Sequence, residues 1–259
     1  MRYGESETIV IPAYVKMARN ERGRKKLAEE IMFYRSVNGL RVPEVLGWNP
    51  LTLAAVDGRQ ATADDYTAII SALADFHDSN PHFGDPGEII RYELYHKIKA
   101  RYNVAGVPSL NIKSVNGTKI GSYERALEYF RTVKVPSTRM CMIHGDPHFG
   151  NIIIDDEGPV FIDPRGRELY GVAEYDLAKV HLSLTGYNEL ENMDPILDIR
   201  NGNLEIPLTV HPLAFKASRL TLLLLAAIWL GNAPGFTGTR KILSHYYALF
   251  MFERVKHLV

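Results

Sequence analysis

Cysteine, net charge and long apolar runs are all scarce in this sequence of 259 residues. The single cysteine, Cys141, excludes an intramolecular disulfide and favours a reducing compartment. Thirty basic and thirty acidic residues cancel, so the charge gives no reason to expect nucleic acid or an anionic membrane as a partner. The one strongly apolar run, residues 220–230, is shorter than the about 20 residues that a membrane span needs. With no apolar core of a signal peptide near Met1, we expect a cytoplasmic protein.

Polar residues interrupt an apolar stretch between positions 139 and 165. His144, Asp146 and Asn151 follow an apolar lead-in, and Asp163 ends the second of two short apolar segments that are separated by turn residues. A hairpin of this length would bring Asn151 close to Asp163. One amide oxygen and one carboxylate are a reasonable protein share of a Mg²⁺ shell completed by water and phosphates. The spacing of carboxylate, amide and second carboxylate is the one that phosphoryl transfer uses in the protein-kinase fold.

The run from His144 to Asn151, followed by Ile162-Asp163, resembles the catalytic loop and metal motif of the aminoglycoside phosphotransferase and choline kinase group. These are small-molecule kinases. Residues 162–166 together with 175–179 are similar to a bacterial branch of that group associated with surface-glycan synthesis. The resemblance implies an α+β, protein-kinase-like fold with a small β-rich N-lobe, residues 1–56, and a larger, mainly helical C-lobe, residues 57–259. It also implies ATP and Mg²⁺ as cofactors.

The resemblance further assigns roles to residues of the motif. Asp146 becomes the group that accepts the proton of the acceptor hydroxyl, and Asn151 and Asp163 become the metal ligands. His144 belongs to the same loop and is taken as a supporting residue. The expected reaction moves the γ-phosphate of ATP to a hydroxyl of a small polar molecule, with a sugar or glycan precursor favoured.

Two more residues of the large lobe are candidates for supporting roles. Asp176 lies at the start of a helix predicted over residues 175–185, and the matching aspartate of the family braces the catalytic loop. The helix dipole alone also favours a carboxylate there. Arg165 could contact phosphate or pair structurally, and both readings stay open.

The small lobe supplies the expected phosphate contact. Lys16 lies in a strand predicted over residues 14–18, and the resemblance makes it the lysine that contacts the α- and β-phosphates; the plain alternative is an exposed strand-edge lysine. In the helix predicted over residues 22–38, Glu30 falls about 40° from the centre of the apolar stripe, whereas Glu29 falls about 140° away. Glu30 is therefore expected to face inward and pair with Lys16.

The resemblance also locates the nucleotide base and limits the size of the acceptor. An adenine-binding backbone is expected at the lobe crossing, from Ala54 to Val56. Residues 4–7 are at best a shortened glycine-rich phosphate cover. Twelve residues separate Asp163 from Asp176 and no Ala-Pro-Glu follows, so the long activation segment of a protein kinase is missing and the acceptor should be small.

The remaining pattern completes the expected architecture. His77 ends a helix begun by the capping pair Thr62 and Asp65, and it is expected to pack without chemistry. Residues 231–239, with Tyr187 and Asn188, are the expected acceptor pocket. Further strands are predicted over 7–11, 45–48 and 51–56, a hairpin around Asn201-Gly202, and further helices over 88–105, 123–133, 212–230 and 240–257.

Rival interpretations remain. His144 and His148 could bind zinc, but no third His or Cys stands at ligand spacing. Cys141 fits a buried spacer better than a nucleophile. The short N-terminal part motivates a nucleotide-binding pseudokinase scaffold as an alternative function. An aminoglycoside-modifying enzyme is another, but residues 212–259 contain a single acidic residue, Glu253, and a polycation should meet more.

Overall fold

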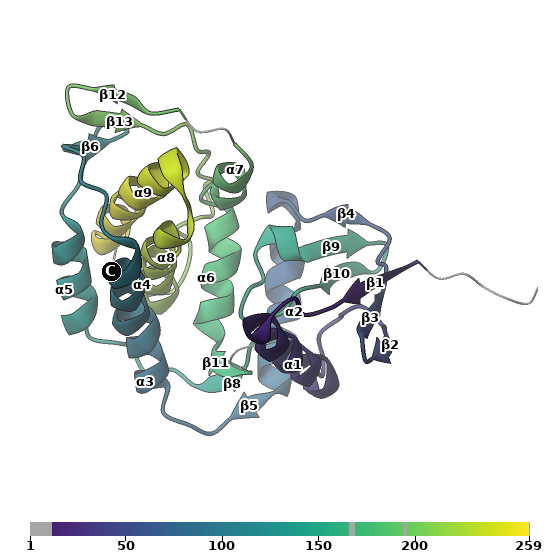
Figure 1. Cartoon of the computed structure of the whole chain (residues 1–259). Helices are drawn as coiled ribbons and strands as arrows, with labels where there is room; N and C mark the ends of the chain where they lie inside the picture. Colours follow the sequence, from purple (N-terminus) through teal and green to yellow (C-terminus); the bar gives the residue numbers. More distant parts are fainter. Residues whose placement is uncertain (1–11, 166–168, 194–195, 259) are drawn as a thin grey trace, which may run out of the picture.

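The computed structural model describes residues 12–165, 169–193 and 196–258, in which a small sheet region lies beside a larger helical region (Figure 1). The expected α+β class, with a small β-rich part and a mainly helical part, is confirmed. The predicted strand at 7–11 and the shortened phosphate cover at 4–7 lie outside the described residues.

The small region is an antiparallel sheet with one helix against it. Its strand order is β1 (Ala13–Lys16), β3 (Leu51–Ala54), β2 (Val45–Trp48). Leu51 and Leu53 are buried and alternate with less buried neighbours, as the two-residue period of a strand requires. Helix α1 (Glu21–Ser36) begins at Asn20, whose side chain accepts a hydrogen bond from the Gly23 amide at 2.8 Å.

One apolar cluster crosses the proposed boundary between residues 56 and 57. Phe33 and Leu51 belong to the same buried cluster as Phe76, Ile152 and Phe161 of the following part of the chain. The two regions therefore share a core, and the division at residue 56 stays a prediction.

Short sheets connect the regions and carry the catalytic segments. Strand β8 (Met140–Met142) is central in one of them, and the hairpin of β9 (Ile152–Asp155) and β10 (Gly158–Phe161) belongs to another. Asn201 and Gly202 have left-handed φ values of 52° and 79°, as a tight hairpin turn requires, so the hairpin predicted there is confirmed. The three sheets are β4 (Arg59–Gln60) with β9 (Ile152–Asp155) and β10 (Gly158–Phe161); β5 (Pro81–His82) with β8 (Met140–Met142) and β11 (Tyr170–Val172); and β6 (Ser114–Val115) with β7 (Thr118–Lys119), β12 (Asp198–Arg200) and β13 (Asn203–Glu205).

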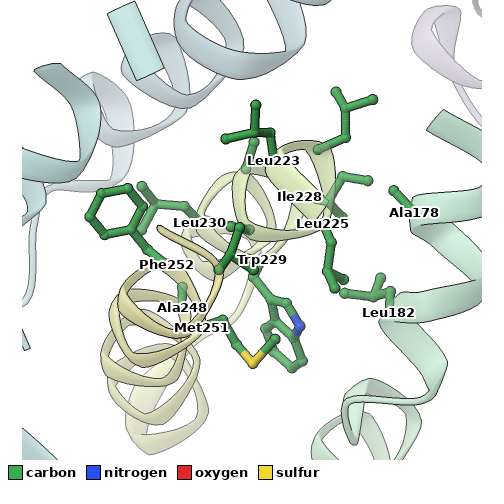
Figure 2. Packing of buried hydrophobic residues seen from close by; sticks show 14 of the residues in the cluster. Ala178, Leu182, Leu223, Leu225, Ile228, Trp229, Leu230, Ala248, Met251 and Phe252 are labelled. Atoms are coloured by element: carbon green, nitrogen blue, oxygen red, sulfur yellow. The ribbon is translucent and has the colours of Figure 1, made fainter. Parts of the chain in front are cut away.

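The helical region is built on α6 (Ala173–Ser183), α8 (Arg219–Asn232) and α9 (Gly238–Lys256). Helix α8 is apolar on all sides and fully surrounded, with Trp229 packed between α6 and α9 (Figure 2). The Trp229 indole donates to the Thr185 hydroxyl at 2.8 Å, which ties α8 to the end of α6. Within the described ranges, every helix is too short or too polar to cross a membrane.

Two predicted helices differ in detail. The helix predicted over 212–230 begins only at residue 219, because the Ser218 side chain caps it by accepting from the Thr221 amide at 3.2 Å. The helix predicted over 88–105 contains a wide π turn, Tyr92–His96, between α3 (Pro86–Arg91) and α4 (Lys97–Ala105). The remaining helices are α2 (Tyr66–Ser79), α5 (Tyr123–Thr132) and α7 (Tyr187–Asn192), with single 3-10 turns at Ala63–Asp65, Phe149–Asn151 and Ala233–Gly235.

Candidate active site

Asp176 of α6 supports the catalytic loop through hydrogen bonds to its backbone. Its carboxylate is fully buried and accepts hydrogen bonds from the backbone amides of His144, at 2.9 Å, and Gly145, at 2.7 Å. Gly145 has a φ of 80°, and a Cβ there would lie 2.7 Å from the Cβ of Arg165, so this position needs glycine. The predicted bracing position of Asp176 is present, although the helix begins earlier, at residue 173.

His77 is buried near the end of α2, as predicted, and it also makes a hydrogen bond that its sequence pattern did not predict. Its Nε2 donates to the Asp176 carboxylate at 2.9 Å, and both side chains are buried. The residues are far apart in sequence, so the pattern around His77 gave only its place at a helix end. The sequence could have suggested this contact only through the general tendency of a buried carboxylate such as Asp176 to have a hydrogen-bond donor nearby.

Asp146 lies beside a lysine to which we had assigned no role. Lys179 Nζ is 2.7 Å from Asp146 Oδ1, and about a third of the Asp146 side chain, 32%, is exposed. Burial would raise the pKa of Asp146, but the charge and hydrogen bond of Lys179, together with the charges of His148 and His144, outweigh it and lower the pKa to about 2. Asp146 is therefore ionised. Lys179 stands one helical turn after Asp176, so both face the loop from α6.

His144 and His148 shape the loop from inside. The His144 ring is buried against the rings of Phe33 and Phe161, and its Nδ1 accepts from the Asp146 amide at 3.3 Å. His148 Nδ1 accepts from the Gly150 amide at 3.2 Å. Burial lowers the pKa of both imidazoles. In the described part of the chain, no three His, Cys, Asp or Glu side chains are grouped as metal ligands.

The β9–β10 hairpin brings the two predicted metal ligands together. The Ile162 amide donates to the Asn151 carbonyl at 3.0 Å, which places Asp163 beside Asn151. Asp163 has a left-handed φ of 54°, an uncommon conformation that recurs at functional sites. The Asn151 amide nitrogen donates to the Asp146 carbonyl at 2.9 Å. Its Oδ1 and the Asp163 carboxylate are hard oxygen donors of the kind that Mg²⁺ prefers.

Lys16 connects helix α1 to the segment that follows this hairpin, because it pairs with both Glu30 and Asp163. Its Nζ lies 2.5 Å from Glu30 Oε1 and 2.6 Å from Asp163 Oδ1. The pairing with Glu30 that the helix pattern predicted is present, and Glu30 is buried. Burial raises the pKa of Glu30 and acts to lower that of Lys16, but hydrogen bonds to Asp163 and Glu30 leave the pKa of Lys16 raised. Lys16 is therefore a charged group at the cleft.

A cavity of about 480 Å³ lies at this site. Five of the six predicted nucleotide and metal residues line it, and the sixth, Glu30, lines the adjoining opening with Lys16 and Asp163. The Ala54 amide already donates to the Glu44 carbonyl at 2.9 Å, whereas the Val56 amide has no hydrogen bond among the described residues. Of the two predicted backbone contacts, Val56 therefore has the donor that a base could use. The lining residues predicted from the sequence are Lys16, Ala54, Val56, Asn151 and Asp163.

Arg165 is engaged with protein groups, which supports the second of its two readings. Its Nη1 donates to the Tyr175 hydroxyl at 2.5 Å, and its guanidinium lies 3.3 Å from the Glu93 carboxylate. Glu93 comes from the π turn and also pairs with Lys97 at 2.5 Å. Glu93 was missed because a π turn has no recognisable sequence pattern.

A second cavity, of about 690 Å³, opens on the helical side of the catalytic loop. It is lined by Arg165 and Tyr187, by residues of α4, and by Asn232, Pro234, Gly235 and Phe236 of the segment predicted as the acceptor pocket. Asn188, which we predicted with them, does not line it. Tyr187 packs edge-on against His148 of the catalytic loop, with ring centroids 6.0 Å apart. Each cavity thus includes a residue in or against the catalytic loop: Asn151 lines the first, and Arg165 and Tyr187 line the second.

Comparison with known proteins gives structural and family matches. None of the curated protein sequences matches the chain. Among solved structures, a fructosamine-3-kinase candidate from Thermobifida fusca is similar, with 19% identity, a TM-score of 0.56, and coverage of 94% of this chain and 86% of that one. Aminoglycoside 2'-phosphotransferase-IIIa in its GDP complex is similar at 12% identity and a TM-score of 0.52, over 93% of this chain and 84% of that one.

At these identities the likeness shows the fold, which is kinase-like as expected. The family evidence comes from the sequence itself. The model of the phosphotransferase enzyme family matches residues 12–203, which include Lys16, the catalytic loop and α6. This range covers most of the chain and every residue of the cleft described above. The chain therefore belongs to the phosphotransferase enzyme family, as its catalytic motif predicted.

Proposed function

We propose that the protein transfers the γ-phosphate of ATP, with Mg²⁺, to a hydroxyl of a small polar molecule in the cytoplasm. The single observation that carries the proposal is the set of contacts of Asp146: its carbonyl accepts from the side chain of Asn151, a proposed metal ligand, and its carboxylate pairs with Lys179. One cavity contains Lys16, Asn151 and Asp163, and the other is lined by Arg165. A sugar or glycan precursor is the acceptor class that we propose, on the resemblance of residues 162–166 and 175–179 to the surface-glycan branch.

The residues divide the work between positioning and charge. Asp146, kept ionised by Lys179, orients the acceptor hydroxyl and receives its proton late in the reaction. A pKa of about 2 makes Asp146 a weak base, so orientation is the larger part of its role. Mg²⁺ bound by Asn151 and Asp163 would neutralise charge on the phosphates. Glu30 holds Lys16 at the cleft, where its ammonium faces the phosphates.

The test is the isosteric change Asp146→Asn. Turnover should fall by about 10² or more, the usual cost of removing a general base, while Mg-ATP affinity should not change. Turnover would be measured as ATP consumption against a panel of sugars, amino alcohols and aminoglycosides. The control is Asp156→Asn, in the exposed β9–β10 turn.

Two results would contradict the proposal. Full turnover in Asp146→Asn would remove Asp146 from the reaction. A wild-type protein that binds Mg-ATP but phosphorylates no acceptor of the panel would instead favour the scaffold alternative.

A further inference from the structure

The acceptor-side cavity has an unequal balance of charge in its wall. Among the residues that the structure describes, three basic side chains line it, from Lys97, Arg101 and Arg165, and one carboxylate, that of Glu191. Glu191 is exposed, so water screens its charge. The wall is therefore positive before any ligand is considered.

Glu93, which is buried and does not line the cavity, neutralises part of this positive charge. Its carboxylate lies 2.5 Å from Lys97 Nζ and 3.3 Å from the Arg165 guanidinium, so two cations share one anion. Burial, followed by the charges of Arg165 and Lys179, lowers the pKa of Lys97 to about 7 against the pull of Glu93. Burial is the largest cause of this shift, and the neighbouring positive charges add to it. A bound anion would favour the charged form of Lys97.

Arg101 is the cation of the wall without a carboxylate partner. Its Nη1 donates to the Gly231 carbonyl at 2.6 Å and to Asn232 Oδ1 at 3.3 Å, at the end of α8. Across the described ranges, no Asp or Glu oxygen lies within ion-pair distance of Arg101, and its Nε and Nη2 make no hydrogen bond. The guanidinium is held through Nη1, and its Nε and Nη2 can donate hydrogen bonds to a ligand. A planar fork of this kind binds oxyanions in two-pronged fashion.

The positive wall continues directly into the catalytic loop. Arg165 packs on Gly145, the residue before Asp146, and Tyr187 packs against His148, two residues after it. Tyr187 and Phe236 add an aromatic side to the same cavity, with ring centroids 6.3 Å apart. A small molecule in this cavity would contact Arg101 and the aromatic side close to the residues that flank Asp146.

We infer that the acceptor of the proposed reaction carries an oxyanion, a carboxylate or a phosphate group, which Arg101 binds while Asp146 engages the hydroxyl. The inference rests on the proposed function. In the transfer, the acceptor oxygen forms a bond to the γ-phosphorus, the bond to the β–γ bridging oxygen breaks, ADP leaves with that electron pair, and the hydroxyl proton passes to Asp146. A polycationic acceptor would meet like charges in this wall.

The test compares binding of four probes that share a hydroxylated ring: D-glucuronate, glucose 6-phosphate, glucose and glucosamine. Titration calorimetry on the full chain would use the wild type, Arg101→Gln and the control Lys99→Gln. Lys99 lies on the same helix, is exposed and does not line the cavity. We expect at least one anionic probe to bind 10-fold or more tightly than glucose and glucosamine. Arg101→Gln should remove most of that preference and Lys99→Gln should keep it.

The outcomes separate the two anion types and the two hypotheses. Tighter binding of glucuronate identifies a carboxylate acceptor, and tighter binding of glucose 6-phosphate a phosphorylated one. Equal or weaker binding of both anions, or equal loss in the two variants, overturns the inference. Binding is measured without turnover, so an anion preference through Arg101 in a protein that transfers no phosphate would defeat the proposed function and not the anion site.

Discussion

Two groups of ion pairs meet at the catalytic loop, and they differ in burial. The inner group, formed by His77, Asp176, Lys179 and Asp146, is closed off on the helical side, with Asp176 0% exposed. The cleft group, formed by Lys16, Glu30 and Asp163, joins the opposite walls, and the Asp163 side chain is 62% exposed. Both groups contain close contacts between opposite charges. Only the inner group has its geometry fixed by buried backbone amides.

The buried group holds the catalytic loop in place, whereas the exposed group can give up its internal contacts to ligands. Buried, fully hydrogen-bonded charges are costly to disturb and hold one arrangement. Exposed pairs contribute little to stability and rearrange easily, which a site needs if metal and nucleotide replace its internal contacts. The contact between Lys16 and Asp163 is of this second kind, since both groups have a proposed ligand of their own. Removal of the exposed Asp163 should therefore act mainly on activity, whereas removal of the buried Asp176 should act mainly on stability.

The largest effect on activity is expected from Asp163→Ala. Loss of a proposed metal ligand should reduce turnover by about 10² or more, the scale found when one group that stabilises the transition state is removed. The free energy of unfolding should change by no more than about 1 to 2 kcal/mol, because an exposed ion pair contributes little and the left-handed backbone at residue 163 suits Ala less well than Asp. Steady-state kinetics and thermal unfolding would be measured together, with Asp156→Ala as the control. Undiminished turnover would exclude Asp163 as a metal ligand.

In the inner group, Asp176→Ala should lower the free energy of unfolding more than Asp163→Ala does. Two backbone amides and the His77 imidazole lose their acceptor, and unsatisfied buried groups cost about 2 to 3 kcal/mol. The melting temperature should fall by roughly 5 to 10 °C for a chain of this size. Asp64→Ala, an exposed change, should stay within about 0.5 kcal/mol of the wild type. A stability loss no larger than that of the control would mean that Asp176 does not brace the loop.

A smaller effect, on pH dependence, tests the contact between Lys179 and Asp146. Burial would raise the pKa of Asp146 but Lys179, His148 and His144 together lower it to about 2, so wild-type turnover should have no acid limb from Asp146 at pH 4.5 to 8. Because the folded pKa is depressed, the stability that this group contributes is present above the unfolded value of about 3.9 and is lost as pH falls toward 2. Lys179→Met should remove the largest of the interactions that oppose burial, so the pKa of Asp146 should rise and an acid limb should enter the measured range.

The control for this prediction is Lys179→Arg, which keeps the charge. Its pH profile of kcat/KM should resemble that of the wild type. If the Lys179→Met profile also coincided with the wild type, the charge of Lys179 would not set the ionisation of Asp146.

Local patterns were sufficient where one short segment forms the feature. The spacing of Asn151 and Asp163 predicted their approach because a tight hairpin fixes it. The helical period placed Glu30 inward because the direction of a helical side chain depends only on its position along the helix. The hairpin at Asn201 followed from turn chemistry alone.

Long-range partners could not be predicted in the same way. His77 and Lys179 look like ordinary helix residues, and their roles depend on where α2 and α6 pack against the loop. Glu93 depends on a π turn, whose extra residue leaves no compositional trace. The helix start at residue 219 was missed because apolar residues before Ser218 continue the pattern without continuing the helix.

The wide turn at Tyr92–His96 has a consequence for how this helix could change over evolutionary time. A π turn corresponds to one residue inserted into an otherwise regular α-helix. Deleting one residue there would restore regular winding, but it would rotate everything on one side by about 100° relative to the other. Glu93 could then no longer face both Arg165 and the lysine at position 97. Helix length in this segment is thus constrained by charge placement, and alignments of related chains should show no gaps across it.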